Sequence, residues 1–161
     1  MVEWTETYVV DDLKMRLVAS KLGLRALQFH HFGEPEGERN DNNEWMTQAV
    51  NELRAYFAGK LHTFSVPLDM QGTEFQLSVW HRLCRIPYGE TRSYAQIAEA
   101  VGRPTAVRAV GAANGSNPVA IIVPCHRVIG SNGKLTGYGG GLPMKKRLLE
   151  LEGAWTMGLR L

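Results

Sequence analysis

The chain has 161 residues, 44% of them apolar and 21% charged, with a formal net charge of +2. This length suits one domain or two small lobes, and the composition is that of a folded globular protein, which excludes a disordered or fibrous chain. No apolar run approaches the roughly 20 residues of a membrane helix, and residues 1–12 lack the basic and apolar regions of a secretion signal.

The distribution of charged residues and the number of cysteines indicate which binding partners and which cellular location suit this chain. Residues 1–99 carry 10 basic and 14 acidic side chains, whereas residues 100–149 carry seven basic side chains and no acidic one. A one-sided positive region suits a polyanion, although a solvated basic face has the same composition. The two cysteines form no C-x-x-C pair, so we expect free thiols, a cytoplasmic or nucleoid-associated protein, and no metal site.

The first part of the chain predicts an antiparallel sheet. Residues 21–23 suit a hairpin turn, and Pro67 restricts residues 62–69 to an edge strand because proline has no N–H to donate. Alternation of apolar and polar residues indicates three further strands, over 5–10, 13–20 and 24–32.

A loop and a helix complete this part. Residues 33–44 have loop composition and are expected to be mobile. Apolar residues at helical spacing predict a helix over 45–57, which Gly59 ends. We therefore assign residues 1–70 to an N-terminal α/β lobe and the whole chain to the α+β class.

The remaining residues, 71–161, predict a mainly helical lobe. Ser93 and Gln96 form the capping box of a helix, and a turn containing Gly102 separates it from the next helix, which is helix-turn-helix spacing. The apolar run 119–123 predicts a buried strand or extended segment that ends near Cys125. The three helices of this lobe that precede Cys125 are expected over 73–83, 93–101 and 105–113. After Cys125 we expect a glycine-rich loop over 130–143 and a last helix over 143–152.

The helix over 105–113 carries one long side chain, Arg108, among small ones. Small side chains let a helix approach a backbone or groove closely, and a lone arginine can enter a base stack as wedge side chains do. The other interpretation is a helix packed in a core, with Arg108 extending to the solvent.

Cys125, in the sequence PCHRV, is a candidate nucleophile. A neighbouring imidazole or cation lowers the pKa of a thiol, and His126 and Arg127 follow it directly. Because adjacent side chains of an extended chain point to opposite faces, we expect a water to bridge Cys125 and His126. Glu152 is a candidate to orient the imidazole. A buried structural thiol is the alternative for Cys125 and the expectation for Cys84.

Two further segments lie near this cysteine in sequence. Asn117 has the character of a turn residue, yet its amide can also hold a loop beside the nucleophile. The glycine-rich residues 137–141 lack the Lys-Ser/Thr of a phosphate-binding loop. A flexible lid with Tyr138 as an apolar wall is an equally good interpretation.

Residues 117–153, which contain NPVAIIVPCHRV, GYGGGL and ELEG, resemble the active-site region of the O6-alkylguanine-DNA alkyltransferases. Residues 86–115 resemble the helix-turn-helix of the same family, so the resemblance covers about half the chain, while residues 1–70 match only in general layout. It implies a ribonuclease H-like N-terminal lobe and a winged-helix or helix-turn-helix C-terminal lobe.

The resemblance implies direct-reversal DNA repair without a cofactor. The alkyl group of O6-alkylguanine in duplex DNA would pass irreversibly to Cys125, once per molecule, and whether O4-alkylthymine also reacts is left open. His126 would take the thiol proton through a water, Glu152 would orient His126, and Asn117 would support the active-site loop.

The resemblance also implies how the flipped base and the minor groove are bound. Arg108 would fill the vacated stack, and Tyr94 would rotate the flanking phosphate and contact the base. The partner is duplex DNA with alkylated bases and no membrane, and we expect a monomer in solution, with cooperative clustering on DNA left open. The pocket would be lined by Tyr138 and by the main chain at Val128 and Gly139, and further DNA contacts would come from Ala106, Val107, Ala109, Gly111 and Ser131.

This chain departs from some relatives in two ways. It lacks the cysteines of an N-terminal zinc site, so we predict no zinc. Gly139 and Asn114 stand where some relatives have serine and a larger apolar residue, which leaves the size of the pocket open. Three alternatives remain at this point: a non-catalytic alkylated-base binding protein, a helix-turn-helix regulator, and a cysteine hydrolase.

Overall fold

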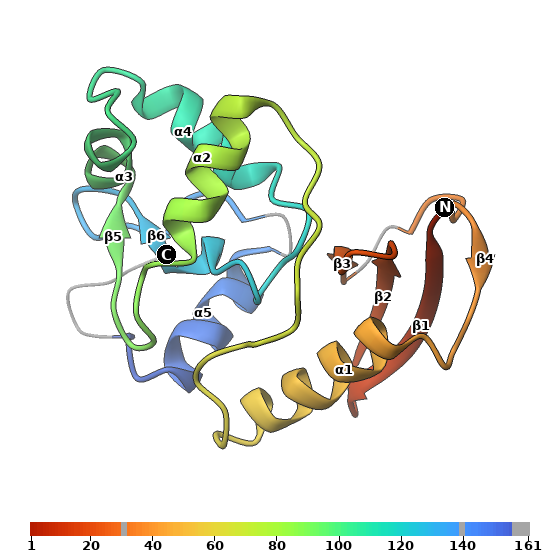
Figure 1. Cartoon of the computed structure of the whole chain (residues 1–161). Coiled ribbons are helices and arrows are strands. Elements are labelled where there is room, and N and C mark those ends of the chain that lie inside the picture. The colour runs from red at the N-terminus through yellow and green to blue at the C-terminus, as the bar shows by residue number, and fades with distance from the viewer. Residues whose placement is uncertain (30–31, 139–140, 156–161) are drawn as a thin grey trace. The chain divides into compact units, whose positions relative to one another are not determined.

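The computed structural model describes residues 1–29, 32–138 and 141–155 (Figure 1). The chain forms two compact units, one made of Met1–Gln71 with Pro118–Ala120, the other of Gly72–Asn117 with the described residues from Ile121 onward. A sheet with one helix forms the first unit and the second is mainly helical, so the predicted α+β class is confirmed. None of the described helices is long and apolar enough to cross a membrane.

The N-terminal unit contains a four-stranded sheet in the order β3-β2-β1-β4. Its neighbours β1, β2 and β3 are antiparallel, with Leu17 opposite both Thr5 and Leu27, whereas β4 is parallel to β1. The third strand ends earlier than predicted, at Gln28; Phe29 and Phe32 are not in a strand, and residues 30–31 lie outside the described part of the chain. The strands are β1 (Glu3–Val10), β2 (Leu13–Ala19), β3 (Leu24–Gln28) and β4 (Glu38–Arg39).

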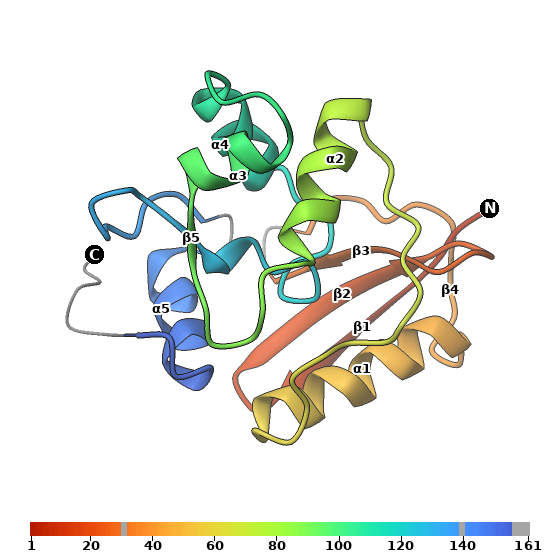
Figure 2. The ribbon, with the colours of Figure 1, turned by 60° about the vertical axis from the view of Figure 1, so that its left-hand side comes forward.

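One helix, α1 (Glu44–Phe57), lies across one face of this sheet, as Figures 1 and 2 show. Asn43 caps the helix, since its side-chain oxygen accepts hydrogen bonds from the backbone N–H groups of Trp45 and Met46. The core between helix and sheet consists of fully buried apolar side chains, among them Met15, Leu17, Leu24, Leu27, Met46, Ala49, Leu53 and Tyr56.

The short strand β4 lies inside the segment 33–44 that the sequence predicts to be a loop. At Gly37, φ is 79°, and a Cβ atom would lie 1.9 Å from the carbonyl oxygen of Val2, so only glycine fits. The guanidinium of Arg39 lies 5.2 Å from the ring centroid of Trp4. Part of the segment is therefore fixed to β1, and mobility of the loop stays a prediction.

Three helices pack together in the C-terminal unit (Figure 1): α2 (Glu74–Leu83), α3 (Tyr94–Ala100) and α4 (Val107–Gly115). Ser93 and Gln96 form the predicted capping box of α3. The helix α4 begins two residues later than predicted, because Pro104 and Thr105 form a turn, and it runs on through Gly115. Their common core includes Val79, Trp80, Leu83, Ile97, Ala98 and Val110.

The apolar run 119–123 is buried, but it is not a strand. Residues 120–122 form a turn in which Ile121 has a φ of 70°, an uncommon conformation for a β-branched residue. Apolarity predicted the burial correctly, yet it does not distinguish a strand from a buried turn. The chain continues into the 3-10 turn η1 (Cys125–Arg127) and the strand β6 (Val128–Ile129), which lies beside β5 (Arg92–Ser93). The last helix of the described residues is α5 (Leu142–Leu151).

Candidate active site

Cys125 is the first residue of η1, and 6% of it is exposed. Its thiol is free, and its backbone N–H donates to the carbonyl of Val123 over 2.8 Å. The expectation of an extended chain here is wrong, so strict alternation of the Cys125 and His126 side chains does not apply. The other cysteine, Cys84, ends α2 and is exposed, which corrects the expectation that it is buried.

Two asparagine side chains hold the backbone around Cys125. Asn117 Nδ2 donates to the carbonyl of Val123 over 2.8 Å, and its side chain also hydrogen-bonds the Cys125 thiol. Asn114, at the end of α4 and 4% exposed, donates from Nδ2 to the carbonyl of Cys125 over 3.3 Å. The sequence leaves the effect of Asn114 on the size of the pocket open, and the structure shows that Asn114 also supports the backbone at Cys125.

His126 and Glu152 form a buried pair. His126 Nε2 lies 2.7 Å from Glu152 Oε2, and both side chains are fully buried. The guanidinium of Arg127 donates two hydrogen bonds to the same carboxylate, from Nε to Oε1 over 2.8 Å and from Nη2 to Oε2 over 2.9 Å. The predicted partner of His126 is therefore beside it. The sequence suggested that the positive charge of Arg127 lowers the pKa of the Cys125 thiol. In the structure this charge is instead paired with the carboxylate of Glu152.

The charge states of this pair fix the tautomer of the imidazole. Burial raises the pKa of Glu152, but hydrogen bonds from His126 and Arg127 outweigh it and bring that pKa to about 2. Burial lowers the pKa of His126, so its imidazole is neutral at pH 7. Because an ionised carboxylate only accepts hydrogen bonds, Nε2 carries the proton. Nδ1, which has no hydrogen-bond partner in the described part of the chain, keeps a free lone pair.

The thiol itself is held in its neutral form by its surroundings. Burial raises the pKa of Cys125, while the hydrogen bond from Asn117 and the charge of Lys145 act in the opposite direction. A nucleophilic thiolate therefore needs a proton acceptor. The free nitrogen of His126 meets that need.

Sequence reasoning missed Lys145, a buried lysine on α5. Its Nζ donates to the carbonyls of Val128 and Thr136, over 2.6 and 3.2 Å. A signal was present in the sequence, because Lys145 lies three and four residues before Leu148 and Leu149 and so shares their apolar helix face.

The predicted substrate-binding residues lie in the same C-terminal unit. Tyr94, the first residue of α3, donates its hydroxyl proton to the carbonyl of Thr136 over 2.9 Å. Val128 is fully buried, and Tyr138 is half-buried in the segment before α5. Gly139 lies outside the described residues.

The predicted DNA-binding residues lie mainly around the first turns of α4. Val107, Arg108 and Ala109 are exposed, whereas Val110 and Ala113 on the opposite side are buried. This helix therefore presents a surface of small side chains with one long cation. The other predicted contacts are Ala106 and Gly111, which are half-buried, and Ser131, which is exposed.

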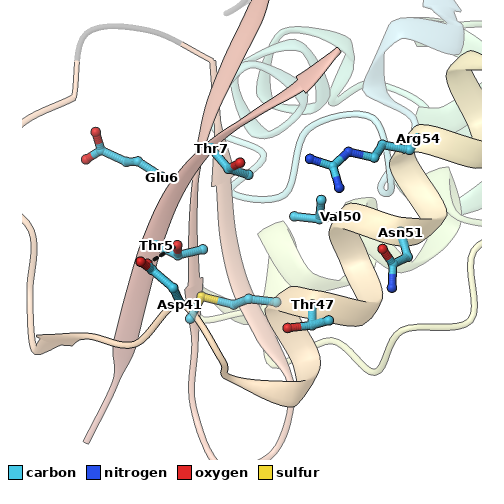
Figure 3. Close-up of a pocket in the computed structure, with 9 residues that line it drawn as sticks. Thr5, Glu6, Thr7, Asp41, Thr47, Val50, Asn51 and Arg54 are labelled. Carbon is cyan, nitrogen blue, oxygen red and sulfur yellow. Dashed lines mark hydrogen bonds between the residues drawn. The ribbon is translucent and has the colours of Figure 1, made fainter.

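A pocket of about 280 Å³ in the N-terminal unit is a second place to consider, between β1 and α1 (Figure 3). Several of its polar groups already have partners. Thr5 donates to Asp41 over 2.6 Å, and Arg54 donates to the carbonyls of Tyr8 and Val9. None of the predicted site residues lines this pocket, so it is not the candidate site.

Comparison with known proteins identifies both parts of the chain. Residues 74–154 match the DNA binding domain of 6-O-methylguanine DNA methyltransferase, and residues 14–70 match its ribonuclease-like domain. The resemblance seen in the sequence is therefore confirmed, and it extends to the N-terminal unit.

Curated relatives and solved structures agree with this match. A methylated-DNA–protein-cysteine methyltransferase of Mycobacterium tuberculosis is 66% identical over 104 residues, which are 65% of this chain and 63% of that protein. One from Methanosarcina acetivorans is 60% identical over 71% of this chain and 73% of the relative. The crystal structure of M. tuberculosis OGT in complex with DNA matches with a TM-score of 0.84 and 47% identity, over 95% of this chain and 92% of that one.

Proposed function

The chain belongs to the 6-O-methylguanine DNA methyltransferase family, and we propose that it repairs DNA by moving the alkyl group of O6-alkylguanine onto Cys125. One observation carries this proposal. A free cysteine is followed by a neutral imidazole whose Nε2 is committed to Glu152 and whose Nδ1 lone pair is free. This arrangement suits the activation of a thiol.

The chemistry is a displacement at carbon. Nδ1 of His126 accepts the thiol proton through a water, and the sulfur of Cys125 forms a bond to the alkyl carbon. The bond between that carbon and O6 breaks, its electron pair stays on the guanine, and a proton returned from His126 neutralises the base. The thioether is stable and nothing regenerates the thiol, so each molecule acts once.

Asn117 and Glu152 act through other residues. Glu152 holds the imidazole in the tautomer that exposes Nδ1. Asn117 holds the Val123 carbonyl and the thiol, and so keeps the sulfur in place for attack. Tyr94, Tyr138 and the main chain at Val128 are the described residues that would form the walls around the flipped base.

Duplex DNA is the partner that the exposed part of α4 supports. The small side chains around Arg108 permit close approach to the minor groove, and Arg108 fills the space of the flipped nucleotide. The DNA complex of the M. tuberculosis relative supports this partner. We place the protein in the cytoplasm or at the nucleoid because its substrate is DNA, and we propose that it is a monomer in solution.

The test is intact-mass and peptide analysis after incubation with duplex DNA that contains one O6-methylguanine. We expect one added methyl group, on Cys125. Cys125→Ser should abolish transfer while DNA binding remains, and Cys84→Ser, which changes the exposed cysteine, should transfer as the wild type does. Binding of the DNA without modification of Cys125 would instead indicate a non-catalytic lesion-binding protein.

A further inference from the structure

The outer edge of β1 is paired along only part of its length. β4 pairs with β1 at Glu3 and Trp4, and the carbonyl of Trp4 accepts a hydrogen bond from the N–H of Asn40 over 2.9 Å. Because alternate residues of a strand direct their N–H and C=O groups to the same side, those of Glu6 and Tyr8 also point away from β2. No group in the described part of the chain accepts a hydrogen bond from the N–H of Glu6 or Tyr8. The strand therefore keeps two free donors beyond the end of β4.

The two carbonyls of this free edge are covered by arginine side chains. Arg39 Nη2 donates to the carbonyl of Glu6 over 3.3 Å, and Arg54 Nη2 donates to the carbonyl of Tyr8 over 3.1 Å. Charged side chains at an edge protect it from unspecific pairing with other strands. A carbonyl oxygen has two lone pairs, so the N–H of an incoming strand can join or replace each guanidinium.

The pocket between β1 and α1 runs along this edge (Figure 3). Three consecutive residues of β1, Thr5 to Thr7, line it, although successive side chains of a strand point to opposite faces, so the backbone edge itself borders the pocket. Its volume of about 280 Å³ is below the range of about 300–1,000 Å³ typical of pockets that enclose a small molecule. The pocket therefore suits the side chains of a peptide that lies along β1. The lining residues from α1 are Met46, Thr47, Val50, Asn51 and Arg54.

The uncompensated charge at this pocket is positive. Two carboxylates line it, and each is already paired with an arginine. Glu6 is paired with Arg16 over 2.8 Å, and Asp41 is paired with Arg39 over 2.9 Å. Arg54, by contrast, donates to backbone carbonyls and forms no ion pair in the part of the chain that the structure describes. Figure 3 shows its guanidinium reaching from α1 towards β1. An anionic group of a ligand is therefore favoured where Arg54 lies.

We propose that this edge and pocket bind the C-terminal segment of a protein partner, which adds to the sheet as a strand parallel to β1 beyond the end of β4. Its backbone pairs with the free groups of Glu6 and Tyr8. Because the added strand is parallel, it ends beside Tyr8, where its terminal carboxylate meets Arg54. The neutral hydroxyls of Thr7 and Thr47 favour uncharged side chains that form strands well, such as threonine and valine.

The probe is the hexapeptide GSTVTV with a free C-terminal carboxylate, and the same peptide with a C-terminal amide is the first control. Nitrogen-15 NMR of the whole protein follows the backbone signals of Glu6 and Tyr8 during the titration. We expect saturable shifts of both signals with the acid, and binding of the amide that is weaker by about tenfold or more, because a hydrogen bond to a charged group is lost. Hydrogen exchange at both N–H groups should slow in the complex.

Two variants locate the binding site. Arg54→Met should weaken binding of the acid to the level of the amide and leave binding of the amide unchanged, because the two changes remove the same ion pair. Asn51→Trp fills the pocket and leaves Arg54 in place, so it should abolish the shifts by a different route. Arg85→Met is the matched control, since this exposed arginine lies outside the pocket and should bind the acid as the wild type does.

Absence of saturable shifts at Glu6 and Tyr8 up to about 1 mM of the acid would overturn the proposal, as would equal affinities for the acid and the amide. Displacement of the peptide by unmodified duplex DNA would assign Arg54 to phosphate binding and would also overturn it. Neither peptide carries an alkylated base, so these results are independent of alkyl transfer to Cys125.

Discussion

Nε2–H of His126 donates a hydrogen bond of 2.7 Å to Oε2 of Glu152, and both side chains are fully buried. The carboxylate is ionised because Arg127 donates to both of its oxygens. One nitrogen of the imidazole is thus fixed by the protein interior and the other is left for chemistry. The same three side chains connect η1 to the end of α5, so the pair contributes to stability as well as to reactivity.

Glu152→Gln should therefore destabilise the protein in a pH-dependent way. The pKa of Glu152 is lowered from 4.5 to about 2 in the folded state. A lowered carboxyl pKa contributes stability that is complete above the unfolded value and is lost as the pH falls towards the folded one. The contribution is on the order of 3 kcal/mol at neutral pH. Urea unfolding of both proteins at intervals from pH 7 to pH 2 measures it.

The difference in unfolding free energy between wild type and Glu152→Gln should be constant from pH 7 to about 5. It should then shrink between about pH 4.5 and 2, where the carboxyl is protonated in the unfolded chain but still ionised in the folded protein. Glu150→Gln, two residues earlier and exposed, is the control that should change stability little. A difference that stays constant down to pH 2 would contradict an ionised, hydrogen-bonded Glu152.

His126→Gln should slow transfer from free O6-benzylguanine to Cys125 by about 100-fold at pH 7, since it removes the proton acceptor. The ratio of the wild-type rate to the His126→Gln rate should decrease as the pH rises, because the thiol then ionises without a proton acceptor from the protein. In the wild type, burial lowers the pKa of His126, so the rate should hold through pH 6.5 and fall only at lower pH, where Nδ1 becomes protonated. Rates from pH 5 to 10 for both proteins provide the comparison. An equal rate ratio at pH 7 and at high pH would assign His126 a structural role only.

Local signals in the sequence predicted most of the helices and failed where long-range contacts decide. The capping box of Ser93 and Gln96 sets the start of α3 through contacts three residues apart, so it can be read directly. The turn at Ile121 cannot be predicted from the local sequence, because its apolar neighbours are compatible with a strand. Only the folded core selects the left-handed conformation of Ile121.

The residues of the candidate site also fall into those that the sequence predicts and those that it does not. Cys125, His126 and Glu152 were named from the sequence, and the structure brings the last two into contact. The pairing of Arg127 with Glu152 was missed, because residues 25 apart in sequence give no periodic signal of contact. Lys145 was missed for a different reason, since lysine is rarely buried and was counted with the solvated basic residues.

Arg108→Ala should slow repair of O6-methylguanine in duplex DNA by about tenfold or more and leave the reaction with free O6-benzylguanine nearly unchanged. Arg108 is exposed on α4 and is proposed to fill the stack after the base has left it, a step that a free base does not need. Single-turnover rates with the two substrates measure the effect. Equal losses with both substrates would argue against this role and point to a change in the Cys125 site.

Gly37→Ala should destabilise the N-terminal unit more than Gly59→Ala does, although both glycines have similar positive φ values of 79° and 74°. The left-handed backbone costs an alanine about 1–2 kcal/mol at either position. Only at Gly37 does the added Cβ also meet a neighbour, the carbonyl of Val2 at 1.9 Å, while nothing lies within 4 Å of it at Gly59. Overpacking of this kind adds about 1–3 kcal/mol. Urea unfolding of the two variants and the wild type measures the difference, and equal destabilisation would show that β4 does not hold this segment against β1.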